Sequence, residues 1–286
     1  MRERLRLAIP NKGRLLDSTL ALLTDAGLVC EAHDRSLVSR VQNHPLDILF
    51  VRTNDVVEFV ADHVADAGIT GGDILAESGV ALPKLRDLGF GRCRLTAAVP
   101  TDSPYDAIGD LTGVRLATSH PNVTRRFFAD QGIAVDVVTL SGAVEVAPRL
   151  GLADGIVDLV STGSTLQMNG LRAIGDILAS EAILVASPAA LQQRAAELDA
   201  IVTMLGSVIA ARSRKYLMMN APAVKLAELE DLLPGLESPS VIPLAHEGMI
   251  AIHSVVGADE VWGLLPKLKI AGASGILVLP IEKILQ

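Results

Sequence analysis

The chain has 286 residues, of which half are hydrophobic and 3% aromatic, and a formal net charge of −8. That charge argues against nucleic acid as a partner, because binding to phosphate backbones needs clustered Lys and Arg. No apolar stretch reaches the ~20 residues of a membrane span, and the two cysteines, Cys30 and Cys93, lack metal-site spacing. We therefore expect a reduced, cytoplasmic protein that does not associate with membranes.

Short β-rich runs alternate with helical patterns over the first two thirds of the chain. The predicted strands are Arg6–Ile9, Asp47–Val51, Ala67–Ile69, Arg94–Val99, Arg115–Ala117, Val135–Leu140, Ile156–Val160 and Ala182–Ala186. The predicted helices include Ser18–Ala26, Asn54–Ala65, Val123–Gln131 and a long one over Pro188–Arg214. This alternation indicates parallel sheets with helices on their faces, in two successive α/β lobes.

The pattern changes after the long helix. We predict strands at Tyr216–Asn220, Ser240–Ala245, Met249–Val256 and Ile276–Pro280, and helices at Val224–Leu233 and Val261–Ala271. The order β-α-β-β-α-β describes a ferredoxin-like unit. A domain boundary is expected near Arg212.

A loop rich in hydroxyl groups follows the predicted strand Ile156–Val160. It consists of Ser161, Thr162, Gly163, Ser164 and Thr165, and is called the hydroxyl loop below. Its hydroxyls and backbone N–H groups could bind a small anion at a helix N-terminus. The alternative is an ordinary turn whose Ser and Thr cap the helix. Since the loop lacks the Lys of a triphosphate-binding P-loop, it better fits a sugar phosphate that is held but not cleaved.

Carboxylates lie close to this loop in the sequence. Asp154 and Asp158 could accept hydrogen bonds from ribose hydroxyls or balance positive charge on a sugar ring; a cap-like Asp and a solvated Asp are the alternatives. Glu145, on a predicted helical stretch before Pro148, is by itself most simply a solvated side chain.

Cations and glycines follow other predicted strands. Lys12 and Arg14 flank a glycine after the first strand, and Arg52 ends the second. Lys12 and Arg14 either lie in a solvated turn or bind a phosphate group. Arg52 either forms a structural ion pair or binds a phosphate group. The turn that contains Gly71 and Asp73 is either a plain turn or a second anion seat.

Two long motifs together resemble the signature of ATP phosphoribosyltransferase, the first enzyme of histidine biosynthesis. They are EVAPRLGLAD at Glu145–Asp154 and DLVSTGSTL at Asp158–Leu166. The resemblance extends to residues 11–15, 68–73, 117–122, 215–222 and 272–283, and so covers nearly the whole chain.

The resemblance implies a fold of two periplasmic-binding-protein-like lobes around a cleft, plus a C-terminal ferredoxin-like (ACT-like) regulatory domain. Lobe I would comprise residues 1–93 and 183–211, lobe II residues 94–182, and the regulatory domain residues 212–286. The implied reaction joins ATP to phosphoribosyl pyrophosphate with Mg²⁺ and releases pyrophosphate. The resemblance also implies a homo-oligomer (dimer or hexamer), inhibition by L-histidine, and no need for a separate regulatory subunit.

The resemblance also suggests roles for particular residues. The hydroxyl loop would bind the 5′-phosphate, and Asp154 and Asp158 the ribose hydroxyls, directly or through Mg²⁺. Glu145 would accept the adenine N6 proton. ATP or pyrophosphate would bind to Lys12, Arg14, Arg52, Gly71 and Asp73, and the three cations among them would meet its charge. Histidine would bind to Asn220, Leu236, Ser238, Ser240 and Gly275.

Two alternatives stay open from the sequence. One is a phosphoribosyltransferase for a different base, and the other is a non-catalytic two-lobed protein that binds a phosphorylated metabolite.

At Asn220 some members of the family that this chain resembles carry Asp. This chain therefore lacks a charge there that would pair with the ammonium group of histidine.

Overall fold

The computed structural model describes residues 3–30, 37–233 and 238–285. The chain forms two compact units, one of Met1–Thr24 with Leu28–Asp199 and the other of Asp25–Gly27 with Ala200–Gln286. The division lies inside helix α7 (Ala195–Arg212). Among the described residues, no helix is both long and apolar enough to cross a membrane.

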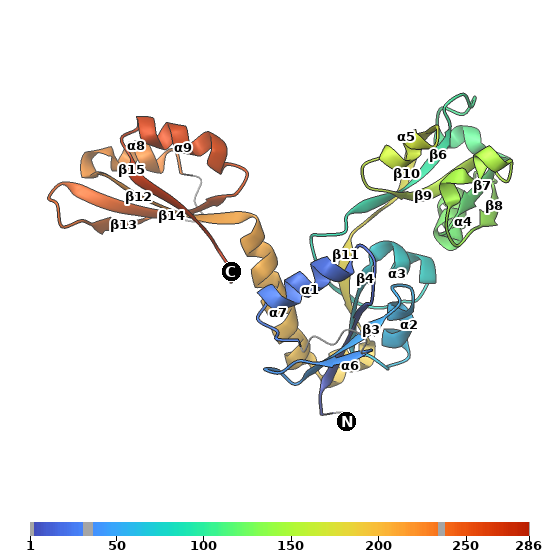
Figure 1. The fold of residues 1–286 in the computed structure, drawn as a ribbon, viewed down its shortest axis with the longest axis horizontal. Helices are drawn as coiled ribbons and strands as arrows, with labels where there is room; N and C mark the ends of the chain where they lie inside the picture. Colours follow the sequence, from blue (N-terminus) through green and yellow to red (C-terminus); the bar gives the residue numbers. More distant parts are fainter. Residues whose placement is uncertain (1–2, 31–36, 234–237, 286) are drawn as a thin grey trace. The chain divides into compact units, whose positions relative to one another are not determined.

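The first sheet of the first unit belongs to lobe I, and the described residues form six strands in it. Figure 1 shows this lobe. The order of the strands is β2 (Val38–Arg40), β3 (Leu46–Val51), β1 (Leu5–Pro10), β4 (Ala67–Gly71), β11 (Ala182–Ala186) and β5 (Lys84–Asp87). The helices of this lobe include α1 (Leu16–Asp25), α2 (Asp55–Ala61), α3 (Gly72–Ser78) and α6 (Pro188–Gln193). Val56 and Val60 of α2 pack against Ala8 and Leu49 of the sheet. Because β1 is parallel to both β3 and β4, the loops after these three strands meet at one edge.

The second sheet belongs to lobe II and has five strands. Their order is β10 (Leu171–Ser180), β6 (Cys93–Pro100), β9 (Gly155–Val160), β7 (Arg115–Thr118) and β8 (Asp136–Thr139). With them lie α4 (Pro121–Asp130), α5 (Ser164–Met168) and the 3-10 turns η1 (Ile108–Leu111), η2 (Val144–Val146) and η3 (Pro148–Leu150). Strand β7 is parallel to β8 and β9. The chain passes between the lobes twice, through residues 88–92 and at Glu181.

The second unit has the predicted β-α-β-β-α-β order. Its elements are β12 (Arg214–Pro222), η4 (Ala223–Lys225), α8 (Leu226–Glu230), β13 (Ser240–Pro243), β14 (Met249–Gly257), α9 (Val261–Ile270) and β15 (Ser274–Pro280). The sheet order is β13-β14-β12-β15. Leu217 and Ile252 on one face of the sheet pack with Leu264 and Leu268 of α9. The predicted α/β class and the ferredoxin-like unit are therefore confirmed.

Several predictions for individual elements were wrong. The predicted strands omit β2 and β5 as well as β10. The alternation predicted parallel sheets, but both sheets of the first unit are mixed, because β2–β3, β4–β11, β5–β11, β6–β9 and β6–β10 pair antiparallel. The sequence analysis missed β10, because register shifts after Ala173 and after Asp176 break its alternation, so that buried and apolar positions recur about every third residue. The long helix predicted over Pro188–Arg214 is interrupted at Arg194, whose backbone leaves the helical region at φ −135° and ψ 28°. Arg194 is 8% exposed and its guanidinium lies 3.5 Å from Asp66, so a tertiary ion pair overrides the helical pattern there.

Candidate active site

The hydroxyl loop begins where β9 ends and continues into α5. Gly163 adopts φ +83°, a left-handed conformation that costs glycine little, and this turns the chain from strand to helix. Ser161, Thr162, Ser164 and Thr165 are all exposed. The hydroxyls of Thr162 and Ser164 lie 3.0 Å apart and so form one hydrogen-bonding surface. Since α5 has only five residues, local N–H groups and hydroxyls contribute more to anion binding here than a helix dipole does.

Asp158 lies on the face of β9 that packs against η2, and Glu145 is on that turn. Asp158 is half-buried, and its Oδ1 accepts a hydrogen bond from the N–H of Leu159 at 2.8 Å. Burial raises the pKa of Asp158, and the negative charge of Glu145 raises it further against the opposing effects of Leu159 and His120. The residue before η2, Ala143, has φ +51°, so the backbone is strained next to Glu145. Two acids therefore share a partly desolvated site just before the hydroxyl loop.

Asp154 and Asp158, both predicted to contact the ribose hydroxyls, lie apart along β9. Asp154 precedes β9, and the loop follows the opposite end of that strand. The two residues are four positions apart in extended chain, which separates their Cα atoms by ~13 Å. Asp154 is exposed, and its Oδ2 accepts a hydrogen bond from the N–H of Arg115 at 3.0 Å. This hydrogen bond stabilises the start of β7.

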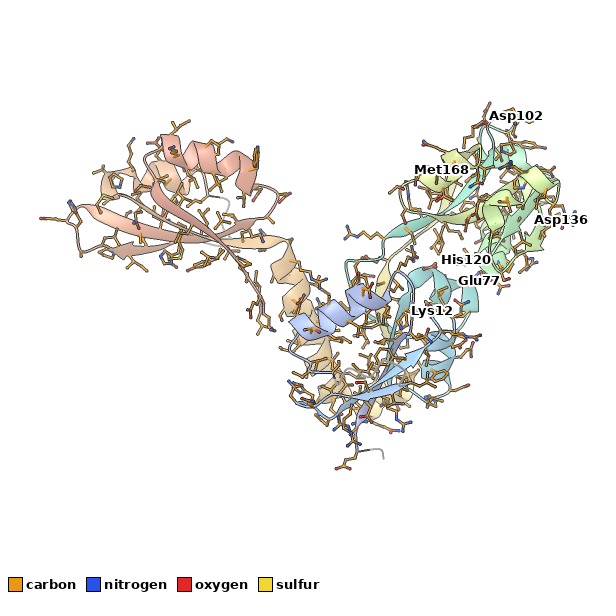
Figure 2. All side chains as sticks on the ribbon, in the orientation of Figure 1. Lys12, Glu77, Asp102, His120, Asp136 and Met168 are labelled. Atoms are coloured by element: carbon orange, nitrogen blue, oxygen red, sulfur yellow. The ribbon has the colours of Figure 1, made fainter. Side chains whose placement is uncertain are left out.

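Three of the predicted cations lie at the carboxyl edge of the lobe I sheet. Lys12 and Arg14 follow β1 and Arg52 follows β3, and all three side chains are exposed. Figure 2 labels Lys12 at the turn that leads into α1. The Arg14 guanidinium also donates a hydrogen bond to Sγ of Cys93 at 3.1 Å, which ties this turn to the start of β6.

Gly71 and Asp73, predicted to contact ATP or pyrophosphate, are both buried. Asp73 accepts a hydrogen bond from Ser180 Oγ at 2.7 Å, and its Oδ2 lies 3.3 Å from Nε2 of His120. Burial by itself would raise the pKa of Asp73, but the hydrogen bonds of His120 and Ser180 and the charge of Arg14 outweigh it and lower the pKa. A side chain at Gly71 would collide with this carboxylate. Asp73 therefore contacts side chains of the other lobe, and Gly71 packs against its carboxylate.

A cavity of about 780 Å³ lies between the lobes, a size typical of small-ligand sites. Its wall includes Ser161 of the hydroxyl loop and Ser180. It also includes three cations that sequence reasoning missed, because nothing in their local sequence marks them: Lys84, Arg92 and Arg94. Each has an acidic partner, Asp87 at 3.0 Å, Glu181 at 3.6 Å and Asp176 at 3.0 Å respectively.

The predicted histidine-binding residues lie in the second unit. Asn220 pairs with Ser274 across β12 and β15, and its Nδ2 lies next to Gly275. Ser240 is two strands away on β13, opposite His253, so it shares the open face of the sheet with Asn220. Ser238 is exposed just before β13, and Leu236 lies outside the described residues.

The two sheets of the first unit and the ferredoxin-like second unit define an α/β protein, as predicted. The profile of the family "ATP phosphoribosyltransferase" matches residues 52–207, and that of "HisG, C-terminal domain" matches residues 211–283. The chain belongs to the ATP phosphoribosyltransferase family, the transferases that catalyse the first step of histidine biosynthesis.

Individual relatives agree with the family assignment. The ATP phosphoribosyltransferase of Gemmatimonas aurantiaca is 45% identical, over 98% of this chain and 99% of its own. That of Methanosarcina acetivorans is 42% identical, also over 98% and 99%. A solved chain of the "ATP phosphoribosyl transferase (HisG:HisZ) complex from Thermotoga maritima" is 30% identical with a TM-score of 0.64, over 72% of this chain and 98% of that one.

Proposed function

We propose that the site between the lobes joins N1 of ATP to the anomeric carbon of phosphoribosyl pyrophosphate. The products are phosphoribosyl-ATP and pyrophosphate. The observation that carries this assignment is the sequence of groups along β9: a partly desolvated acid at Asp158, facing Glu145, and then the exposed hydroxyl loop. A ribose 5-phosphate needs such an arrangement, with donors for the phosphate and acceptors for the ribose hydroxyls.

In this proposal the 5′-phosphate binds to the hydroxyl loop. The hydroxyls of Thr162 and Ser164, already 3.0 Å apart, donate to phosphate oxygens together with backbone N–H groups. Asp158, three residues before Ser161, accepts hydrogen bonds from the ribose hydroxyls. Asp154 has no part in this subsite, since it lies at the other end of the strand.

The chemistry requires little covalent work of the protein. The bond from the anomeric carbon to pyrophosphate breaks, the pyrophosphate takes the electron pair, and the lone pair of adenine N1 forms the new bond. Positive charge develops on the sugar ring, and the carboxylates of Asp158 and Glu145 stabilise it. The cations Lys12, Arg14 and Arg52 neutralise the pyrophosphate and triphosphate groups. Glu145 is our candidate to accept the N6 proton that the product loses.

Mg²⁺ fits this site only together with substrate. Among the residues that the structure describes, no group of three or more His, Cys, Asp or Glu side chains is placed to hold a metal ion. Mg²⁺ commonly binds through one or two carboxylates plus substrate phosphates. Asp158 suits this role, since it is a hard oxygen ligand beside the acid Glu145. Bound Mg²⁺ would supply positive charge to the leaving pyrophosphate.

We also propose regulation by L-histidine, in a homo-oligomer that needs no separate regulatory subunit. The Thermotoga chain was solved in a HisG:HisZ complex. The match covers 98% of that chain but only 72% of this one. This chain in addition matches the HisG C-terminal domain at residues 211–283.

A cytoplasmic location is part of the proposal, in keeping with the free cysteines Cys30 and Cys93.

An ultraviolet difference spectrum tests the activity. Protein is mixed with ATP, phosphoribosyl pyrophosphate and Mg²⁺, and we expect an absorbance change that requires all four, since N1-substituted adenine absorbs differently from ATP. A change only with another purine or pyrimidine would instead support a phosphoribosyltransferase for a different base. Binding of phosphoribosyl pyrophosphate without any turnover would support the non-catalytic alternative.

A further inference from the structure

Helix α3 of lobe I and helix α4 of lobe II are joined by hydrogen bonds from side chain to backbone. Both carboxylate oxygens of Glu77 accept from the first turn of α4, Oε1 from the N–H of Asn122 and Oε2 from the N–H of Val123, each at 2.9 Å. In return Nδ2 of Asn122 donates to the backbone oxygen of Glu77 at 3.0 Å. The guanidinium of Arg126 donates to the backbone oxygen of Ala76. Figure 2 labels Glu77 and His120 where the two lobes meet.

Helix α4 is thus capped by the other lobe. His120, the residue at its N-cap position, makes no capping hydrogen bond with its own side chain in the described structure. Helices usually obtain this cap from a nearby Ser, Thr, Asp or Asn. Here a carboxylate 45 residues earlier in the chain supplies it. Such a contact is charge-assisted and is favoured by the positive end of the helix.

A second carboxylate on α3 binds the same turn. Asp73 lies four residues before Glu77, so the two share a face of the helix. Asp73 contacts His120 and also Ser180, which precedes the passage between the lobes at Glu181. Asp73, Glu77, His120 and Asn122 are called the α3–α4 latch below.

We propose that the α3–α4 latch aligns the two halves of the active site and that Glu77 and His120 are positioning residues for the transfer. The latch holds the turn after β7, and β7 pairs with β9, with Thr118 opposite Val157. Strand β9 carries Asp158 and leads into the hydroxyl loop. On the other side, α3 follows β4, whose parallel neighbour β1 leads to Lys12 and Arg14. The latch therefore fixes the ribose-phosphate subsite relative to the cations, and this inference rests on the proposed function.

The latch predicts a particular kinetic signature. If each substrate binds mainly to one lobe, loosening the latch disturbs their mutual alignment more than the binding of either one. A displacement of ~1 Å between reacting groups can cost about 100-fold in rate. We therefore expect kcat to fall when the latch is broken, with smaller changes in the KM values for ATP and phosphoribosyl pyrophosphate.

Glu77→Ala, Glu77→Gln and Glu58→Ala test the proposal on the full chain. Glu58 is a matched control, because it is an exposed acid on α2 of the same lobe. Glu77→Ala should accelerate amide hydrogen exchange at Asn122 and Val123 and lower kcat by roughly tenfold or more. Glu77→Gln keeps one acceptor oxygen and should recover part of both effects. Glu58→Ala should match the wild type.

Two results would overturn the proposal, and they can be told apart. If Glu77→Ala accelerates exchange at Asn122 and Val123 but has the same kcat as Glu58→Ala, the latch is a structural contact without a positioning role. If the wild type itself shows no transfer, the proposed function fails and the positioning role fails with it.

Discussion

Nε2 of His120 lies 3.3 Å from Oδ2 of Asp73, and these two side chains, one from each lobe, are 6% and 2% exposed. The pKa of Asp73 is lowered, so its carboxylate is ionised and only accepts hydrogen bonds. With Nε2 as the donor in this contact, Nδ1 faces Ser119 Oγ at 3.0 Å. A buried, oriented imidazole thus connects the lobes.

His120→Ala should lower the free energy of unfolding by ~1–3 kcal/mol, because it removes a donor from a buried carboxylate. His120→Gln offers an N–H donor of similar reach and should lose less. Urea denaturation of both variants checks this. Equal losses for the two would show that the volume of the ring matters and the hydrogen bond to Asp73 does not.

Asp158→Asn should abolish most turnover and yet raise the unfolding temperature at pH 7. The folded-state pKa of Asp158 is raised above its ordinary value of 3.8, so its ionised form costs folding stability. That cost is absent below pH 3.8, appears as the pH rises through the folded-state pKa, and is complete at neutral pH. Asn removes the charge and can still accept from Leu159.

Thermal denaturation from pH 3.5 to pH 8 measures this difference. We expect the advantage of Asp158→Asn to be largest near neutral pH and to shrink towards the acid end. A variant that is less stable than the wild type at pH 7 would contradict the assignment of Asp158 as a partly desolvated acid.

Thr162→Val should raise the KM for phosphoribosyl pyrophosphate more than the KM for ATP. The valine keeps the shape but removes a hydroxyl from the hydroxyl loop, at a cost of ~1 kcal/mol, or about fivefold in KM. Thr112→Val, at an exposed position after η1, is the matched control and should change neither. Equal effects of Thr162→Val on both substrates would mean that the loop does not hold the 5′-phosphate.

Asn220→Asp should bind L-histidine about tenfold more tightly than the wild type, because a carboxylate restores a charged partner for the ligand ammonium. Titration calorimetry on the intact protein measures both affinities, with Ser213→Ala as a control at an exposed residue before β12. Absence of histidine binding to both proteins would refute the assignment of this face as the regulatory site.

The local sequence predicted those features that depend on short-range patterns. Short β-rich runs located most strands, and the hydroxyl loop follows β9 as predicted. Strand β10 was missed because its register shifts replace alternation by a helix-like spacing. Asp154 and Asp158 are close in the sequence, but Asp154 precedes β9 and Asp158 is the fourth of its six residues, so extended chain separates them.

Long-range contacts explain the rest. Asp73 has the sequence context of a ligand-facing turn, and only the fold shows it buried against Ser180, 107 residues away. The Glu77 cap on α4 joins two lobes and has no signature in either segment alone. Such contacts depend on how the two sheets meet, which no local pattern encodes.

The bond formed in the reaction tests the central claim most directly. Phosphoribosyl pyrophosphate labelled with carbon-13 at the anomeric carbon is incubated with the protein, Mg²⁺ and ATP labelled with nitrogen-15 at N1, and the product is examined by NMR. We predict a one-bond carbon–nitrogen coupling that appears with the wild type and is nearly absent with Asp158→Asn. A product without this coupling, or no product with the wild type, would contradict the account.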